Sequence, residues 1–381
     1  MPTKSNKKIV NKLVLIGNGF DLALDLKTKY EDFLFWYLKN SVLKGLVNFS
    51  PVLIDQRSRA FHYFEDDLFL FYNERNHIMD QIQTQVQEYK CLNDIKKFLK
   101  DNIYGFYIKL KSSLLDKIYS ESNSGWVDIE KSYFELLKAE IDKEENDIDK
   151  LNKDLKTLSS NLKEYLIALN YNKLEDEELA IKHTSQFIKK VDSSDLIEII
   201  IENEKLQTDH IYFLNFNYTP SLEIILNSAK TSELRHFKDK ISINQIHGNI
   251  NAENDSLIFG YGDEMDIDYK KIEQLNDNRF FDNIKSFKYA ENKNYRDLLR
   301  FVNAEAFQVV VYGHSCGLSD RLMLNEIFEH ENCISIKIYF YNRQEFINKT
   351  MDISRHFNSN KLMRKKIVEF DSNNLIPQLE K

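Results

Sequence analysis

Residues 12–30 read KLVLIGNGFDLALDLKTKY, a stretch in which four apolar residues lead into a glycine-rich turn. The unbroken apolar run from Leu13 to Ile16 is typical of a strand that is buried on both faces, as in a parallel sheet. Gly17 and Gly19 allow a sharp turn and a close approach of the backbone to a ligand, and a following helix would direct N–H groups toward it. The stretch therefore predicts the first strand of an α/β fold and a phosphate-binding loop, although a plain strand-to-helix turn has the same pattern.

Glycine is rare in this chain and its placement is selective. There are only 10 glycines in 381 residues, and most of them follow apolar, strand-like runs. Glycine costs backbone entropy wherever it is not needed, so this placement favours close ligand approach at strand ends. The glycines in question are Gly17, Gly19, Gly248, Gly260, Gly262, Gly313 and Gly317.

Composition indicates a well-packed globular protein, with 42% hydrophobic and 13% aromatic residues. The formal net charge of −8 disfavours nucleic acid and anionic membranes as partners. The 3 cysteines have no metal-site or disulfide spacing, which predicts free thiols and a reducing compartment. Because no apolar run reaches the length of a signal or membrane segment, we expect a cytoplasmic protein.

Strand-like apolar runs recur in the second half of the chain. Together with the opening strand, and separated by helical or loop segments, they predict a Rossmann-like parallel α/β sheet. The sheet would form a split core of residues 1–30 and 206–381, interrupted by a large helical insertion at 31–205. The later runs lie at 211–214, 241–246, 256–259, 307–312 and 334–341.

The insertion carries helical patterns at 30–48, between 52 and 122, from 127 onward and at 187–200. The most regular pattern lies near 130–170, where apolar residues from Phe134 to Leu169 recur at spacings of three and four, with Glu144 as the exception. We call this row of apolar residues the heptad seam. A helical hairpin, a pairing within the chain or a homo-oligomer would each bury it. Its function is either internal packing or contact with a partner.

Polar, turn-forming segments follow the predicted strands. In an open parallel sheet the carboxyl ends of the strands border one crevice, so we expect these segments to form a nucleotide site. They are Gly17, Asn18, Gly19, Phe20 and Asp21; Asn215, Phe216, Asn217, Tyr218 and Thr219; His247, Gly248 and Asn249; 260–264; and 313–320, with Gly313, His314, Ser315 and Asp320.

In this order, the segments resemble the AbiH family of bacterial abortive-infection proteins. The matching motifs are I-G-N-G-F-D at 16–21, L-x-T-x-Y-x-D-F at 26–33, W-x-D-x-E at 126–130, F-N-Y-T at 216–219, I-H-G at 246–248, I-F-G-Y-G-D-E at 258–264 and G-H-S-x-x-x-S-D at 313–320. Asp25 stands where glycine is expected, and Cys316 where an aliphatic residue is commoner. The resemblance implies antiviral defence through abortive infection.

The order of these loops is also similar, more distantly, to sirtuin-like NAD-binding domains, whose bacterial defence members cleave NAD. This resemblance implies that Gly17 and Gly19 lie against the cofactor phosphates, and that Gly313 and Ser315 contact the adenosine side. Asn217 would hold the nicotinamide-side ribose or the attacking water, and His247 would be the base on the ribose. The sirtuin zinc cysteines are absent, which fits a hydrolase or a binder better than a deacylase.

Cleavage of the bond to nicotinamide builds oxocarbenium character on the ribose, so a base or a water-positioning group is needed more than an acid. A histidine and an asparagine can supply these functions. Alternatives remain for each residue. His247 could bond to backbone at a strand end, and Asn217 could cap the helix near Pro220. Ser319 or Asp320 could likewise cap the helix at Arg321.

An acidic cluster of Asp263, Glu264, Asp266 and Asp268 lacks the pattern of a calcium loop. We expect a solvated turn there and no metal cofactor. The leading hypothesis is an effector that hydrolyses NAD when a phage or host protein triggers it. The alternative is a nucleotide-binding sensor without turnover. A nuclease is disfavoured by the acidic charge.

Overall fold

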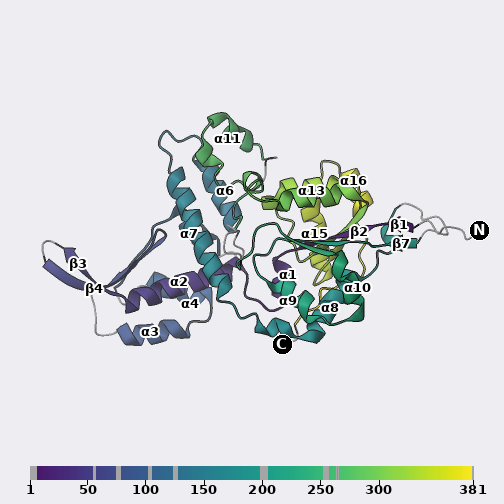
Figure 1. The fold of residues 1–381 in the computed structure, drawn as a ribbon. Coiled ribbons are helices and arrows are strands. Elements are labelled where there is room, and N and C mark those ends of the chain that lie inside the picture. The colour runs from purple at the N-terminus through teal and green to yellow at the C-terminus, as the bar shows by residue number, and fades with distance from the viewer. Residues whose placement is uncertain are drawn as a thin grey trace, which may run out of the picture. The chain divides into compact units, whose positions relative to one another are not determined.

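A computed structural model describes residues 7–54, 57–73, 79–101, 105–122, 128–197, 205–251, 257–262, 264 and 266–379. The chain forms two compact units (Figure 1). The core unit comprises 1–26, 169–270 and 283–381, and the inserted unit comprises 27–168 and 271–282. Residues 169–197 and 205, which the sequence pattern grouped with the insertion, thus belong to the core unit.

The core unit contains a five-stranded, all-parallel sheet in the order β11-β10-β2-β8-β9. The opening strand lies at its centre, where Val14 pairs with Val310 on one side and Phe213 on the other. All six residues of this strand are buried, which explains the unbroken apolar run. The strands are β2 (Asn11–Ile16), β8 (Ile211–Asn215), β9 (Ile241–Gln245), β10 (Phe307–Tyr312) and β11 (Cys333–Tyr339), and β1 (Lys7–Ile9) pairs separately with β7 (Lys205–Gln207).

Helices pack on both faces of this sheet. Leu13 and Leu15 belong to an apolar cluster with α13, α14 and α15, whereas Val14 and Ile16 belong to a cluster with α1, α8, α9 and α10. The core helices are α1 (Asn18–Ala23), α8 (Glu177–Ile188), α9 (Ser221–Ser228), α10 (Ser232–Phe237), α12 (Lys285–Lys288), α13 (Asn294–Ala304), α14 (Arg321–Glu329), α15 (Arg343–Ser354) and α16 (Asn360–Lys366). Short 3-10 turns are η2 (Asn172–Glu175), η3 (Ser193–Asp195), η4 (Lys238–Lys240) and η6 (Leu318–Asp320).

The strand order creates a switch point in the middle of the sheet. From β2 the chain continues to β8 and β9 on one side, and then returns to β10 and β11 on the other. In open α/β sheets, ligands bind in the crevice outside the carboxyl ends of the strands where the order reverses. In this protein that position lies between the ends of β2 and β10.

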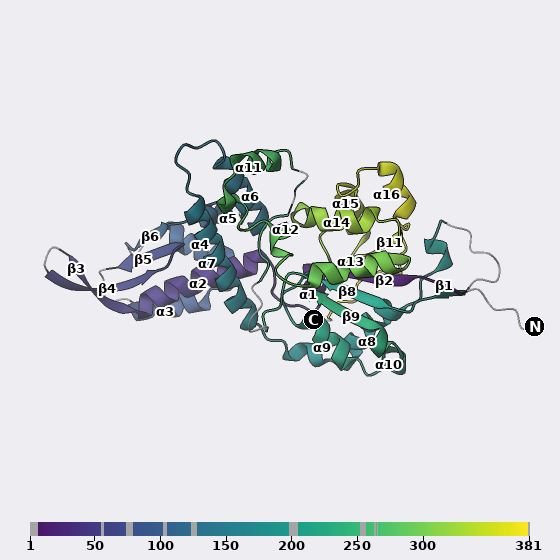
Figure 2. The ribbon, with the colours of Figure 1, turned by 45° about the horizontal axis from the view of Figure 1, so that its top comes forward.

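The inserted unit combines a four-stranded antiparallel sheet, ordered β3-β4-β5-β6, with helices. Helix α2 packs against β4 and β5 (Figure 2). The strands are β3 (Phe49–Ile54), β4 (Arg57–Glu65), β5 (Phe69–Asn73) and β6 (Tyr107–Leu110). The helices are α2 (Tyr30–Val47), α3 (Met79–Glu88), α4 (Leu92–Asp101), α5 (Ser113–Glu121), α6 (Ile129–Ala139), α7 (Ile148–Ile167) and η5 (Asn278–Phe280); α11 (Tyr269–Leu275) crosses the boundary of the two units.

The prediction of an all-helical insertion was wrong between 52 and 122, because four strands lie in or border this region. In β5, Phe69, Phe71 and Asn73 are buried and alternate with half-buried residues. Aromatic residues favour strands, and in short windows their spacing overlaps with that of a helix face.

Two other element predictions need correction. Residues 257–259 form no strand, and the following Tyr261 makes only an isolated bridge to Ile284. A helix over 187–200 was expected, but α8 ends at Ile188 and residues 189–197 do not continue it, whereas residues 198–200 lie outside the described residues. Short apolar runs of this kind do not by themselves distinguish a strand, a helix or a buried loop. Ser256 and Trp126, which belonged to the expected elements, lie outside the described residues.

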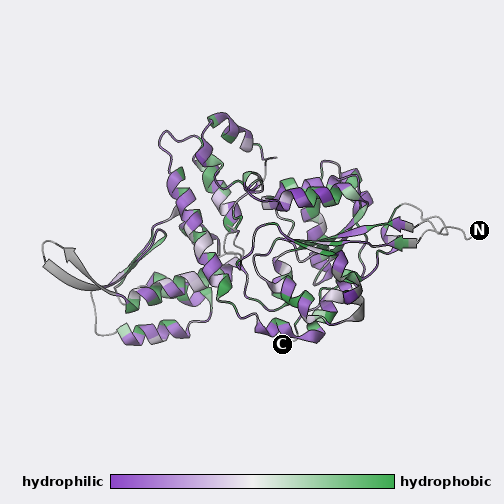
Figure 3. Cartoon of the chain, viewed as in Figure 1, coloured by the Kyte–Doolittle hydropathy of each residue, from purple (hydrophilic) through white to green (hydrophobic). Residues whose placement is uncertain are grey.

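The heptad seam near 130–170 folds into two helices, α6 and α7, which pack on each other and on α5. Glu144, the exception in the seam, lies in the loop between them. Leu151, Leu155, Leu158 and Leu162 are all buried within one chain, and Figure 3 colours α7 in alternating hydrophilic and hydrophobic bands.

Substitution of Leu158 by alanine tests this internal packing. Because the side chain is only 1% exposed, Leu158→Ala is expected to destabilise the inserted unit by about 2–5 kcal/mol in urea unfolding. The exposed neighbour Lys156 serves as control, and Lys156→Ala is expected to change the free energy of unfolding by less than about 0.5 kcal/mol. Equal effects of the two changes, or a loss that varies with protein concentration, would contradict internal packing.

Candidate functional site

The loops that follow β2 and β10 lie against each other. The Gly19 N–H donates to the Gly313 carbonyl at 2.8 Å, and Ile16 bridges to Gly313. Gly313 has a φ of +76°, and a Cβ placed there would lie 2.3 Å from the Phe20 nitrogen. Only glycine permits both this conformation and this approach. These glycines therefore join the two loops at the switch point.

The same contact reduces the number of free N–H groups in the predicted phosphate-binding loop. Helix α1 begins at Asn18, and the N–H groups of Gly19 and Phe20 donate to the carbonyls of Gly313 and Gly17, both at 2.8 Å. These first-turn donors are therefore engaged by the protein itself. Asn18 is exposed in the first of these loops, and Ser315 and Leu318 are exposed in the second. Contact of Gly17 and Gly19 with a phosphate remains a prediction.

Asn217 and Asp21 form a buried polar network beside this junction. The Asn217 amide donates to the Gly17 carbonyl at 3.1 Å, and the Asp21 carboxylate accepts hydrogen bonds from Thr219, at 2.7 Å, and Ser221. Burial raises the pKa of Asp21 to about 6, although the hydroxyl donors oppose this shift. Asn217 thus holds the loop in place. It does not cap α9, whose N-terminal cap position is Pro220.

Asp320 is the centre of a second buried cluster. Its Oδ1 lies 2.9 Å from the Lys285 Nζ and 3.2 Å from the His247 Nε2, and its Oδ2 lies 3.7 Å from the His314 Nε2. Burial alone would raise the pKa of Asp320, but the Lys285 ammonium and His247 outweigh it and hold this pKa well below the usual value. Asp320 occupies the cap position of α14 but makes no side-chain cap bond.

The two histidines of this cluster are neutral at pH 7. Burial, followed by the charge of Lys285, lowers the pKa of His247, and burial lowers the pKa of His314 to about 3. The His247 ring also contacts the Tyr289 hydroxyl at 3.2 Å and bonds to the backbone of Phe216. His247 therefore makes the expected backbone bond and, in addition, a side-chain pair with Asp320.

Several predicted residues support the loops. The Tyr218 hydroxyl donates to the Ile258 carbonyl at 3.0 Å, and the His314 Nδ1 accepts from the Cys316 N–H at 3.0 Å. Gly248 has a φ of +85°, a conformation that favours glycine. The Ser315 carbonyl accepts from Lys349 at 2.8 Å.

Sequence reasoning missed Lys285 and Tyr289. Both lie in the segment that returns to the core unit after residues 271–282, and neither follows a strand. Lys285 is only 1% exposed, yet a lysine among polar and apolar neighbours gives no sequence signal of such burial.

The family model of bacteriophage abortive infection AbiH matches residues 13–342, from the opening strand to the loop after β11. The chain belongs to the AbiH family. This membership gives the AbiH protein a role in phage abortive infection. A comparison with proteins of curated function gives no match. Across the described parts of the chain, no helix is long and apolar enough to cross a membrane.

The two departures from the AbiH pattern share an unusual backbone. Asp25 and Cys316 have φ values of +55° and +54°, in the left-handed region that most side chains disfavour. A glycine would relieve this strain at Asp25. In the ranges that the structure covers, no group of three or more His, Cys, Asp or Glu residues suits a metal ion. Asp263 of the acidic cluster lies outside these ranges.

Gly313→Ala tests the loop contact in AbiH. The left-handed backbone alone costs an alanine about 1–2 kcal/mol, and the close approach to Phe20 adds a clash. Gly105→Ala is the matched control, because Gly105 has a φ of +66° and nothing within 4 Å of the added Cβ. Hydrogen exchange should show greater local destabilisation for Gly313→Ala. Equal effects would show that the approach to Phe20 is unimportant.

Asp320→Asn tests the buried cluster. It leaves the Lys285 charge uncompensated, so we expect a loss of about 3–5 kcal/mol in the free energy of unfolding. The ionised carboxylate stabilises AbiH above its unfolded pKa of about 3.9, and this contribution is lost as the pH falls toward the lowered folded pKa. Urea unfolding from about pH 3 to about pH 8 measures both effects.

The control is Asp297→Asn, which removes a surface pair with Arg300 and is expected to cost less than about 1 kcal/mol. Adding Lys285→Met to Asp320→Asn should recover part of the stability, because it removes the unpaired charge. If Asp320→Asn is no more harmful than Asp297→Asn, the ion pair does not hold this region together.

Proposed function

We propose that this AbiH protein acts in phage abortive infection by binding NAD, or a related nucleotide, and hydrolysing its bond to nicotinamide. The observation that carries the proposal is the switch point between β2 and β10, at which the Gly17–Asp21 and Gly313–Asp320 loops meet. Nucleotides bind at this position in doubly wound sheets. The order of the loops along the chain supports a sirtuin-like form of this fold.

The exposed residues suggest how the ligand is held. Asn18 and Ser315 would contact phosphate and ribose groups, and the Asn217 amide lies directly beneath the first loop through its bond to Gly17. The side of the site that faces the protein interior would be shaped by Phe20, Asp21, Tyr218, Gly248 and His314.

In the proposed reaction, the bond from the ribose to nicotinamide breaks and its electron pair leaves with neutral nicotinamide. A water oxygen bonds to the ribose carbon and loses a proton, giving ADP-ribose. His247, as the base at the ribose, would accept this proton, and the adjacent Asp320 carboxylate would stabilise the resulting imidazolium. This mechanism requires no metal ion.

A second function, nucleotide binding without turnover, is favoured by one observation. His247 is only 4% exposed and its ring faces Asp320, Tyr289 and the backbone of Phe216. A catalytic base must reach the proton that it takes. If His247 stays buried when the ligand binds, AbiH would act as a sensor that a phage or host protein engages.

Mass spectrometry of NAD and nicotinamide, in cells with and without phage, tests hydrolysis. Wild-type AbiH should deplete NAD on infection, whereas His247→Ala and Asn217→Ala should abolish the depletion. The matched control is His210→Ala, because His210 precedes β8 at the amino edge of the sheet and should not affect NAD. Protein abundance and melting temperature identify any variant that fails to fold.

Unchanged NAD together with intact phage protection would overturn hydrolysis. Calorimetry with purified AbiH and NAD then tests the sensor. Binding that Gly19→Val abolishes and His247→Ala preserves would support a binder at this edge of the sheet. Absence of NAD binding by the wild-type protein would exclude both functions for NAD.

A further inference from the structure

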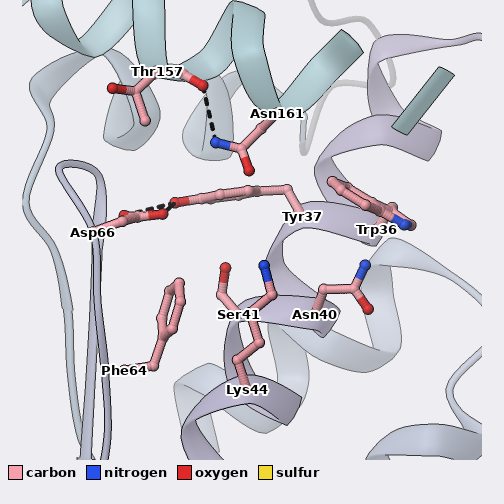
Figure 4. A pocket seen from close by; sticks show the side chains of 9 residues that line it. All are labelled: Trp36, Tyr37, Asn40, Ser41, Lys44, Phe64, Asp66, Thr157 and Asn161. Atoms are coloured by element: carbon pink, nitrogen blue, oxygen red, sulfur yellow. Dashed lines mark hydrogen bonds between the residues drawn. The ribbon is translucent and has the colours of Figure 1, made fainter. Parts of the chain in front are cut away.

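The inserted unit contains a pocket of about 240 Å³ at the junction of α2, β4 and α7. Figure 4 shows its lining side chains, all of which come from this unit. It is separate from the strand-end loops of the core unit, and nothing in the proposed function uses it. The lining residues are Trp36, Tyr37, Asn40, Ser41, Lys44, Phe64, Asp66, Thr157 and Asn161.

One side of the pocket is fixed before any ligand binds. The Tyr37 hydroxyl donates to the Asp66 Oδ2 at 2.8 Å, and the Asp66 Oδ1 accepts from the N–H groups of Leu68 and Phe69, both at 2.8 Å. Burial, reinforced by the Asp66 charge, raises the pKa of Tyr37, so this hydroxyl remains protonated. A pocket with such internal support needs little reorganisation to bind a ligand.

Other groups of the pocket have unused hydrogen-bonding capacity. The Asn161 amide nitrogen donates to the Thr157 carbonyl at 2.9 Å, and its oxygen points toward the Tyr37 ring (Figure 4). The Asn40 amide makes no hydrogen bond to the part of the chain that the structure describes. The pocket therefore offers both an acceptor and a donor to a ligand.

Lys44 supplies a positive charge. Its ammonium points into the pocket and lies 5.8 Å from the centre of the Phe64 ring (Figure 4). Within the described ranges, no carboxylate forms an ion pair with it. Acidic residues outnumber basic ones in this chain, 60 to 52, yet Lys44 forms no such ion pair within the described ranges. Its charge is therefore available to bind an anionic ligand.

We propose that this pocket binds a nucleoside monophosphate. The Trp36 and Phe64 rings, on opposite sides of the pocket in Figure 4, offer apolar faces against which a base can stack. Asn40 and Asn161 match the mixed donors and acceptors of a base edge. Lys44 matches the phosphate.

The size and polarity of the pocket favour this ligand over two others. The volume is at the small end for ligand pockets, which usually measure about 300–1,000 Å³, so it favours a mononucleotide over a dinucleotide such as NAD, which is about twice as large. An apolar side chain from a protein partner would fill the space between the rings. It would leave the Asn161 oxygen and the Lys44 charge without partners, which costs affinity.

Calorimetric titration of the full-length protein tests the proposal, with AMP, GMP, CMP and UMP and their nucleosides as probes. Wild-type protein should bind at least one monophosphate in a saturable manner. Lys44→Gln should weaken the monophosphate at least about tenfold and leave the nucleoside unchanged, whereas Asn161→Ala should weaken both. The matched control is Gln81→Ala, which removes an exposed amide from α3 of the same unit and should change nothing.

Three outcomes would overturn the proposal. The first is no saturable binding of any probe. The second is binding that neither Lys44→Gln nor Asn161→Ala affects. The third is binding that Gly19→Val abolishes while both pocket variants retain it, which would assign the nucleotide to the core unit. Because Lys44 and Asn161 belong to the inserted unit and Gly19 to the core unit, the variants locate any binding, and failure of this proposal leaves NAD hydrolysis in the core unit unaffected.

Discussion

The contact between the carboxyl ends of β2 and β10 determines the geometry of the core unit. The backbone of Gly19 bonds to that of Gly313, at a spacing that no side chain on Gly313 would permit. This contact joins β2 near the start of the chain to β10, which lies far along the sequence. It also brings the AbiH loop motifs from both ends of the chain to one edge of the sheet. Asn217, His247 and Asp320 lie in the segments that follow β8, β9 and β10, at the carboxyl ends of these strands.

Behind this edge, one carboxylate organises the charges. Asp320 compensates the buried Lys285 and lies next to two neutral histidines, so a cluster that would be costly as separate charges is stable as a group. The same arrangement bears on function. A histidine beside an ionised aspartate can accept a proton, yet His247 is already engaged by its neighbours. Phage abortive infection follows from membership of AbiH, and the chemistry behind it depends on whether this cluster opens to a ligand.

The inserted unit has its own packing and its own pocket. Its helical hairpin buries the heptad seam within one chain, and α2 lies between the antiparallel sheet and the other helices. The pocket at α2, β4 and α7 depends on the Tyr37–Asp66 bond, which links a helix to the turn after β4. Under the two proposals, a ligand there and a ligand at the core sheet would be bound by different elements of the chain.

The sequence by itself determined the parallel sheet, the burial of its opening strand on both faces and the position of most of its loops, because buried parallel strands and glycine turns leave strong local patterns. It also determined the AbiH family, through motifs along most of the chain. The tertiary structure decided the antiparallel sheet of the inserted unit, where aromatic spacing was ambiguous. It also decided the partners of Asp320. Lys285 and Tyr289 are distant from Asp320 along the chain, and burial of a lysine depends on the charge that the fold places beside it.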